Sequence, residues 1–306
     1  MGNISIKECA VIANDVYFNY NKIASTWTRF HQKTGGDDGF FGAAYSRGSD
    51  VVVGIRGTQE GQDILDDMGM APNLNGEIAG AAMKKMILDY VAGYPDSKTG
   101  AETFGFIAKW IFSKKAVRHA TSNWGNQVPE NQALLGRSFL MQVNNYCLSN
   151  RKRLRCIVGH SLGGAISQYL SEQTGYGGLT GIKSRIPAVA FNSPNMGTLS
   201  GMHKGSGAIL IINARLDPLS YLTREVGNVS HAMDKAHEIS NVDVGKPKDP
   251  PPPVIPNVSI EESNLKAFKN WLPGALLHYH SMDSMQAALS TGDLGKSLLS
   301  THFPFL

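Results

Sequence analysis

One glycine-flanked serine has the neighbours that nucleophilic chemistry requires. Ser161 lies in segment 159–163, whose sequence GHSLG matches the G-x-S-x-G pattern of a nucleophile elbow. An apolar strand is expected at 154–158 and a helix at 165–172, so the serine falls at a strand–turn–helix junction. There the hydroxyl points out above a sheet, and the N–H of Leu162 can donate to a developing oxyanion. This context favours a nucleophile over the alternative, a glycine-rich helix start with an incidental serine.

A serine hydroxyl is too weakly acidic to attack an ester alone, so an acid and a histidine base are expected after it in the chain. The apolar run 208–213 predicts a later strand, and Asp217 lies in the loop just beyond it. Because an Asp before Pro218 also starts turns, a structural role for Asp217 stays open. Asp234 and Asp243 are weaker candidates, since no clear strand precedes either.

The base is expected among the histidines that follow the serine. His278 and His280 both lie just before a predicted helix that runs to about Leu289. We favour His280, but only the geometry of the loop can decide between the two. The remaining histidines are weaker candidates. His203 precedes Asp217 in the chain, and His302 lies near the C-terminus. His231 and His237 have a spacing typical of a solvated helix face.

The second oxyanion donor is expected on a loop that follows an early strand. The apolar run 51–55 predicts such a strand, and Gly57 and Thr58 come directly after it. Gly57 allows the backbone to approach a ligand, and Thr58 offers both an N–H and a hydroxyl donor. The acidic cluster at 63–67 is expected to cap the next helix and lacks the spacing of a calcium loop, so no metal is predicted.

The predicted elements alternate between strand and helix, which favours an α/β fold with a mostly parallel sheet flanked by helices. The proline-rich segment 245–257 suits neither helix nor central strand, and we interpret it as a surface loop within one domain, 1–306. The expected elements are a helix at 6–20, strands at 40–45 and 51–55 joined by a turn, a helix at 129–147, a strand at 154–158, a helix at 165–172, strands at 187–191 and 208–213, and a helix that ends near 289.

One long segment, 68–127, is predicted to be a helical insertion that forms a cap or lid. It contains the most aromatic stretch of the chain, with Phe104, Phe106 and Trp110 near several lysines. Such a stretch suits a lid or a helix at a lipid surface, and the three aromatic residues are therefore candidates for substrate contact. A core helix of the cap is an equally good interpretation.

Composition excludes several other classes of function. The net charge of +4 is too small and too scattered for a nucleic-acid-binding protein. Cys9, Cys147 and Cys156 lack the spacing of a zinc site or a disulfide framework, and no cofactor is predicted. Lys7 and Asp15 lie where a secretory signal would be apolar, and no run reaches the length of a membrane span, so the chain is predicted to be cytoplasmic as synthesised.

Several motifs together resemble the class 3 lipase family, which is part of the α/β-hydrolase superfamily. The resemblance extends from about Phe40 to about Leu289 and keeps the family's order of motifs. Departures are Ile64, where the family often has Trp, a missing His-x-Gly-Phe segment, and the segment 68–127, which has no counterpart. The motifs that carry it are 53–58 (VGIRGT), 63–66 (DILD), 159–165 (GHSLGGA), 191–194 (FNSP), 213–217 (NARLD) and 280–282 (HSM).

The resemblance implies an α/β-hydrolase fold and a serine esterase that acts on lipids as a lipase or phospholipase. Carried over by position, Ser161 is the nucleophile, Asp217 the acid and His280 the base, with Thr58 and Leu162 at the oxyanion hole. The expected partners are a lipid or phospholipid substrate and, transiently, a membrane surface. A thioesterase or small-ester esterase, and a non-catalytic hydrolase-like interaction module, remain as alternatives.

The resemblance also implies a biological setting. Some bacterial relatives are injected without a signal peptide as antibacterial phospholipase toxins, including type VI effectors, and each is paired with an immunity protein. The sequence is compatible with such an exported effector and equally with an intracellular lipid hydrolase.

Overall fold

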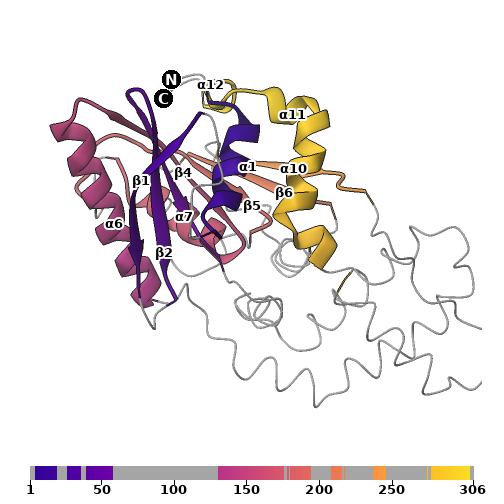
Figure 1. The fold of residues 1–306 in the computed structure, drawn as a ribbon, viewed down its shortest axis with the longest axis horizontal. Coiled ribbons are helices and arrows are strands. Elements are labelled where there is room, and N and C mark those ends of the chain that lie inside the picture. Colours follow the sequence, from indigo (N-terminus) through magenta and orange to yellow (C-terminus); the bar gives the residue numbers. More distant parts are fainter. Residues whose placement is uncertain are drawn as a thin grey trace, which may run out of the picture.

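The computed structural model of the chain describes residues 4–18, 26–35, 39–57, 130–175, 178, 180–193, 208–215, 217, 237–245, 274 and 277–303. The centre of this part is a seven-stranded sheet whose strands lie side by side in sequence order (Figure 1). The first three strands pair antiparallel, and all later pairs, from β3 to β7, are parallel. The strands are β1 (Thr28–Thr34), β2 (Phe41–Arg47), β3 (Asp50–Ile55), β4 (Arg153–His160), β5 (Ala188–Phe191), β6 (Ile209–Ala214) and β7 (His237–Val242).

Helices cover both faces of the sheet, which confirms the predicted mostly parallel sheet flanked by helices. Helices α1 and α10 lie against one face, and α6 and α7 against the other (Figure 1). The described helices are α1 (Ile6–Asp15), α6 (Glu130–Ser149), α7 (Leu162–Glu172), α10 (Met282–Thr291), α11 (Asp293–Lys296) and α12 (Leu299–His302).

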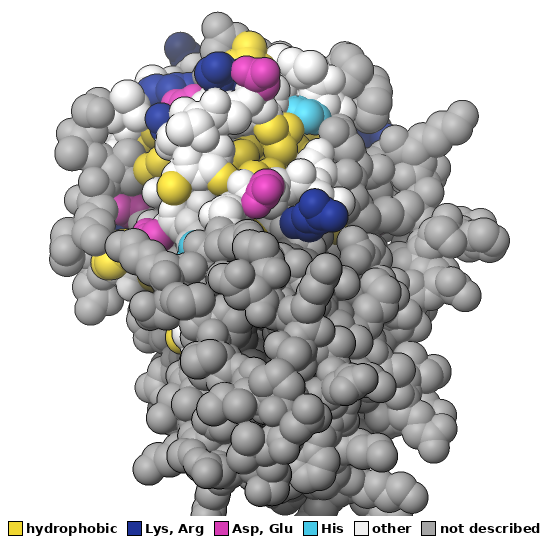
Figure 2. Space-filling model, turned by 90° about the vertical axis from the view of Figure 1, so that its right-hand side faces the viewer, with side chains coloured by type: hydrophobic (Ala, Val, Ile, Leu, Met, Phe, Trp, Pro, Cys, Tyr) yellow, Lys and Arg dark blue, Asp and Glu magenta, His cyan; other side chains and the backbone are white. Residues whose placement is uncertain are grey.

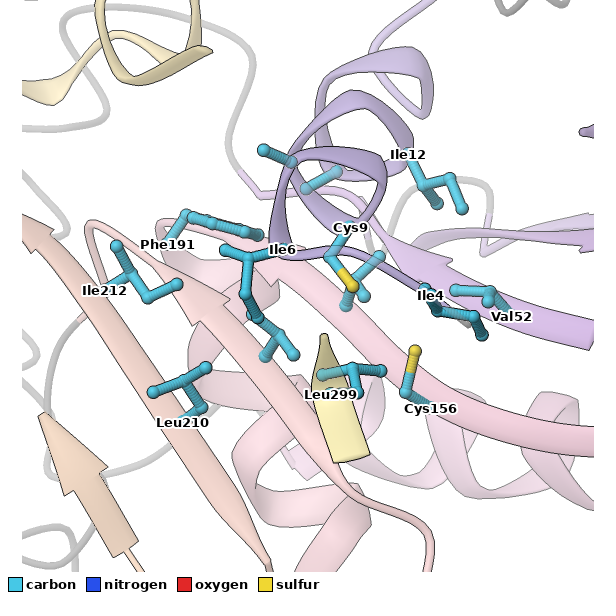
Figure 3. Packing of buried hydrophobic residues seen from close by; sticks show 14 of the residues in the cluster. Ile4, Ile6, Cys9, Ile12, Val52, Cys156, Phe191, Leu210, Ile212 and Leu299 are labelled. Carbon is cyan, nitrogen blue, oxygen red and sulfur yellow. The ribbon is translucent and has the colours of Figure 1, made fainter. Parts of the chain in front are cut away.

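The central strands are apolar on both faces because each face meets a helical layer. In β3, Val51 and Val53 pack with α6 and α7, whereas Val52 between them packs with α1. Figure 3 shows the core on the α1 side, where Cys9 of α1 and Cys156 of β4 lie among aliphatic side chains. Each fully buried aliphatic side chain stabilises the fold by about 1.5–3 kcal/mol.

Helix α1 is fixed at both ends by side chains. It begins with a capping box in which Ser5 and Glu8 exchange backbone and side-chain hydrogen bonds. It ends at Asp15 rather than at residue 20 as predicted, because Arg29 of β1 donates to the carbonyls of Asp15 and Phe18 at 2.6 and 2.8 Å. These bonds satisfy carbonyls that a longer helix would use, and residues 16–18 form a turn and a bend instead of helix.

The two edge strands, β1 and β7, were not predicted from the sequence. Both are polar, and the side chains of β1 are exposed or half-buried. Since β7 directly precedes Asp243, the sequence-based reason for discounting that residue was wrong. Its side chain is nevertheless exposed, and its carboxylate accepts a hydrogen bond from the Gly245 N–H.

Several predictions fall on residues outside the described part of the chain. These are the helical insertion 68–127 and nearly all of the proline-rich segment 245–257. Among the helices that the structure does describe, none combines the length and apolar character needed to cross a bilayer. On the face shown in Figure 2, acidic, basic and apolar side chains of the described residues lie interspersed.

Candidate functional site

The turn that holds Ser161 has the backbone of a nucleophile elbow. Ser161 joins β4 to α7 with φ 58° and ψ −131°, a region that non-glycine residues enter at a cost of about 1–3 kcal/mol. Close packing requires the flanking glycines: a Cβ at Gly159 would lie 2.2 Å from the Gly163 carbonyl oxygen, and one at Gly163 would lie 2.3 Å from that of Ile55. Ser161 is 1% exposed, and its Oγ has no hydrogen-bond partner within the described residues.

The chain that leaves β3 passes directly against this turn. A Cβ at Gly57 would lie 2.5 Å from the His160 carbonyl oxygen and 3.0 Å from the Ser161 Cβ, so only glycine fits. The next residue, Thr58, lies outside the described residues, and its role as an oxyanion donor stays a prediction. Leu162 is the first residue of α7, and its N–H is one of those that no helix satisfies internally.

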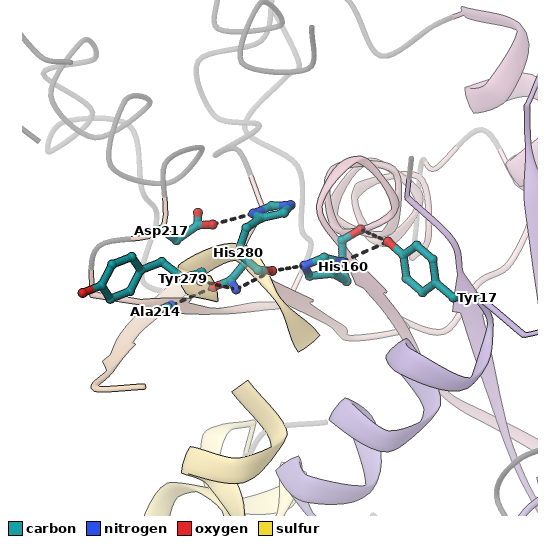
Figure 4. A network of polar contacts seen from close by, with 7 residues as sticks. Tyr17, His160, Ala214, Asp217, Tyr279 and His280 are labelled. Carbon is teal, nitrogen blue, oxygen red and sulfur yellow. Dashed lines mark hydrogen bonds and ion pairs between the residues drawn. The ribbon is translucent and has the colours of Figure 1, made fainter. Parts of the chain in front are cut away.

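A buried aspartate–histidine pair lies at the same edge of the sheet. Asp217 follows the end of β6, and its Oδ1 is 2.5 Å from Nδ1 of His280 (Figure 4). The side chains are 0% and 2% exposed. Because a carboxylate only accepts, Nδ1 donates in this contact, and Nε2 is the outer nitrogen of the ring. Nε2 is also buried without a hydrogen-bond partner among the described residues.

The structure separates the two candidate histidines. Both occupy the helical turn 277–280, where residues two apart point to nearly opposite sides. His278 therefore lies away from Asp217: its Nε2 is 3.3 Å from the Gly245 carbonyl oxygen and its Nδ1 is 3.3 Å from Ser284 Oγ. Only His280 of the two meets the aspartate.

His160 connects the turn to the base, a role that the sequence did not predict. Its Nε2 is 2.7 Å from the His280 carbonyl oxygen, and its Nδ1 is 2.9 Å from the Tyr17 hydroxyl (Figure 4). Burial, and then the nearby His280, hold the pKa of His160 well below its usual range, so the ring is neutral. Since a carbonyl only accepts, Nε2 donates to it and Tyr17 donates to Nδ1. Tyr17 in turn accepts from the Gly57 N–H at 3.1 Å.

Asn192, which directly follows β5, is a further buried polar residue; it belongs to the motif 191–194, to which the sequence analysis assigned no role in the site. Its Nδ2 donates to the carbonyls of Tyr279 and His280, each at 3.1 Å, and its Oδ1 accepts from the Ala214 N–H at 2.7 Å. The tolerance of asparagine for positive φ was the available signal, because Asn192 has φ 44°. Tyr17, at the end of the first helix, carried no such signal.

The structure does not assign a place in this site to the remaining predicted site residues. Phe104, Phe106 and Trp110 lie outside the described residues. Within the described residues, no group of three or more His, Cys, Asp or Glu side chains could hold a metal ion. Cys9, Cys147 and Cys156 are buried and not disulfide-bonded.

Comparison with known proteins gives little further information. No protein-family model matches the chain, and no curated protein matches it. Among solved structures, the Lip2 lipase from Yarrowia lipolytica is similar over 79% of each chain, with 13% sequence identity and a TM-score of 0.40. A likeness at this level does not show a shared activity.

Proposed function

We propose that this chain is a serine hydrolase that cleaves carboxylic esters of lipids, with Ser161, His280 and Asp217 as its catalytic triad. One observation carries the proposal. A buried aspartate–histidine pair lies at the sheet edge where a strained turn holds a serine. Among the described residues, neither the outer histidine nitrogen nor the serine hydroxyl has a hydrogen-bond partner. Strain and unpaired buried polar atoms are tolerated where chemistry needs them.

The proposed reaction proceeds through an acyl-enzyme. Ser161 Oγ attacks the ester carbonyl carbon while its proton passes to Nε2 of His280, and Asp217 stabilises the resulting imidazolium. The oxyanion accepts from the N–H of Leu162 and, as predicted from sequence, from Thr58. His280 then protonates the departing alcohol, and it activates a water that releases the acyl group. The serine and histidine do not hydrogen-bond in this structure, and such contacts often tighten only when substrate binds.

Strand order supports an α/β-hydrolase arrangement for this site. The serine follows β4, the aspartate follows β6, and the histidine comes last, so all three reach the carboxyl edge of parallel strands. The lipid part of the proposal rests on the motifs at 56–58 and 191–194, which resemble those of class 3 lipases. A thioesterase and a small-ester esterase would use the same triad, and only substrate tests separate them.

The first test measures fatty-acid release from mixed micelles of phospholipid and triacylglycerol, with wild type beside Ser161→Ala. We expect release that the substitution abolishes, and the products identify the lipid class. Activity only on soluble esters or thioesters would support the alternatives instead. Activity on none of these substrates would contradict the enzyme proposal and favour an interaction module.

The second test uses two histidines that lie two residues apart. His280→Ala should lower kcat by roughly 10⁴-fold or more, as expected when a triad base is lost. His278→Ala, which removes contacts to Gly245, Ser284 and the Tyr279 ring, is the matched control and should stay within about threefold of wild type. Equal losses in both variants would refute the assignment of the base.

The antibacterial setting is proposed from the family resemblance alone. If the chain acts on lipids of a target cell's envelope, production with an added periplasmic leader should slow growth more than cytoplasmic production does. Ser161→Ala should remove that difference. Equal tolerance in both compartments would favour an intracellular lipid hydrolase without an immunity protein.

A further inference from the structure

Asn192 uses its whole side-chain amide to join two loops that are distant in the sequence. Two donor bonds reach the carbonyls of Tyr279 and His280, and one acceptor bond comes from the Ala214 N–H. The residue is 0% exposed and adopts φ 44°. A buried asparagine in a left-handed conformation is retained only where its bonds offset the strain.

These bonds span the two halves of the aspartate–histidine pair. Ala214 is the last residue of β6, and a turn bond from the Asp217 N–H to the Ala214 carbonyl leads from it to the acid. Tyr279 and His280 form the segment that presents the base. The amide of Asn192 therefore fixes the backbone on either side of the 2.5 Å contact between Asp217 and His280.

The carbonyl of His280 has a second donor, which comes from the neighbouring strand. His160 Nε2 donates to it at 2.7 Å, beside the 3.1 Å bond from Asn192. The two bonds occupy both lone pairs of one carbonyl oxygen. They tie the backbone of the base to the ends of β4 and β5, and β4 leads directly into Ser161.

We infer that Asn192 is a positioning residue for the proposed triad: it holds the backbone of His280 so that the imidazole is presented to both Asp217 and Ser161. This inference rests on the proposed function for its catalytic consequence. Without the amide, each of the two carbonyls loses a donor; the His280 carbonyl keeps its bond from His160, but the segment 279–280 is held less firmly and can shift. A displacement of about 1 Å at a reacting group costs roughly 10²-fold in rate.

Two substitutions separate the hydrogen bonds from the backbone shape. Asn192→Gly suits the positive φ and removes all three bonds without adding strain. Asn192→Asp keeps the shape and the acceptor for Ala214, but it replaces both donors by a carboxylate oxygen that faces two carbonyls. Arg151→Gly is the control, because Arg151 also has positive φ, 53°, but is exposed.

The experiment measures kcat and KM on a soluble ester, together with the proton NMR signal of the His280 Nδ1–H, which Asp217→Asn identifies by its loss. For Asn192→Gly we expect kcat to fall roughly 10²-fold while KM changes less than about threefold, and the signal to shift or broaden. Arg151→Gly should leave both readouts unchanged. If Asn192→Gly does not fold, Asn192→Asp is measured in its place with the same expectation.

Wild-type kcat and an unchanged signal in a folded Asn192 variant would overturn the inference. A fall in kcat with an unmoved signal would also overturn it, since the histidine would then be held by other contacts. If the wild type hydrolyses no ester at all, the proposed function fails, but the NMR signal still decides whether Asn192 holds His280. The two failures are thus distinguishable.

Discussion

Ser161 occupies a position where its side chain destabilises the fold, and this makes a prediction that does not depend on knowing the substrate. A buried hydroxyl without a partner costs about 1–3 kcal/mol, and Ser161 Oγ has no hydrogen-bond partner among the residues that the structure describes. Ser161→Ala removes this cost, so the free energy of unfolding should rise by about 1 kcal/mol or more. In a chain of this size, that corresponds to an increase in Tm of roughly 2 °C.

A second substitution separates the hydroxyl from the backbone strain. Alanine keeps the Cβ and hence the strain of φ 58°, which is about 1–3 kcal/mol. Ser161→Gly also removes that strain but adds about 1 kcal/mol of backbone entropy cost. Glycine should therefore be at least as stable as alanine, and more stable by up to about 2 kcal/mol.

The assay is urea and thermal unfolding of both variants beside a control serine. Ser167 is equally buried, but its Oγ donates to the Gly163 carbonyl at 2.7 Å, so Ser167→Ala should lose about 1 kcal/mol. A loss of stability in Ser161→Ala as large as that in Ser167→Ala would refute the reasoning. It would mean that the Ser161 hydroxyl has a hydrogen-bond partner in the folded chain.

Three further predictions concern other buried groups. The side chains of Asp15 and Arg29 are 1% and 7% exposed and form a 2.6 Å ion pair, which Asp15→Asn breaks. The substitution should lower the free energy of unfolding, measured in urea, by about 3–5 kcal/mol, and a loss below about 1 kcal/mol would contradict this. The pKa of His160 is lowered in the folded chain, so below about pH 6.5 the unfolded chain binds a proton that the folded chain does not, and the free energy of unfolding should decline. His160→Gln should flatten this decline when unfolding is measured across that pH range. An unchanged decline would mean that His160 is charged in the folded chain. Burial raises the pKa of Cys147 to about 11. Iodoacetamide at pH 8 should therefore alkylate this thiol at least about 100-fold more slowly in the folded than in the unfolded chain, which peptide mass spectrometry can measure. Equal rates would contradict the burial of Cys147.

The sequence predicts the interior of the sheet better than its edges, for a physical reason. Strands β3 and β6 and the second half of β4 are covered on both faces, so they read as largely apolar runs. Strand β1 is an edge strand with exposed and half-buried side chains, and β7 has the polar sequence HEISNV. These strands are held by backbone hydrogen bonds to a neighbouring strand. Such bonds do not require apolar side chains, so the sequence shows no apolar periodicity there.

For the candidate site, local sequence predicts the turn at Ser161, whereas Asp217 and His280 could be named only from chain order and from the resemblance. The glycines on either side of Ser161 specify the turn. They pack against each other and against one neighbouring loop, so the requirement for glycine is visible within a few residues of sequence. The contact between Asp217 and His280 joins residues 63 apart. No local pattern distinguishes His280 from His278, because their difference arises from which side of one helical turn faces the strand ends.

The unpaired and strained groups of the described structure are not spread evenly, and their distribution is itself an argument for a functional site. Six buried side-chain atoms in this part of the chain lack a hydrogen-bond partner, and three of them are Nε atoms of arginines. The other three belong to Ser161, His280 and Asn213, all at the carboxyl edge of β4 to β6 or in the segment packed against it. Of the three described non-glycine residues with positive φ, Ser161 and Asn192 also lie there. Selection for stability alone would favour relief of these costs, so their concentration at one edge supports the proposal that this edge carries the chemistry.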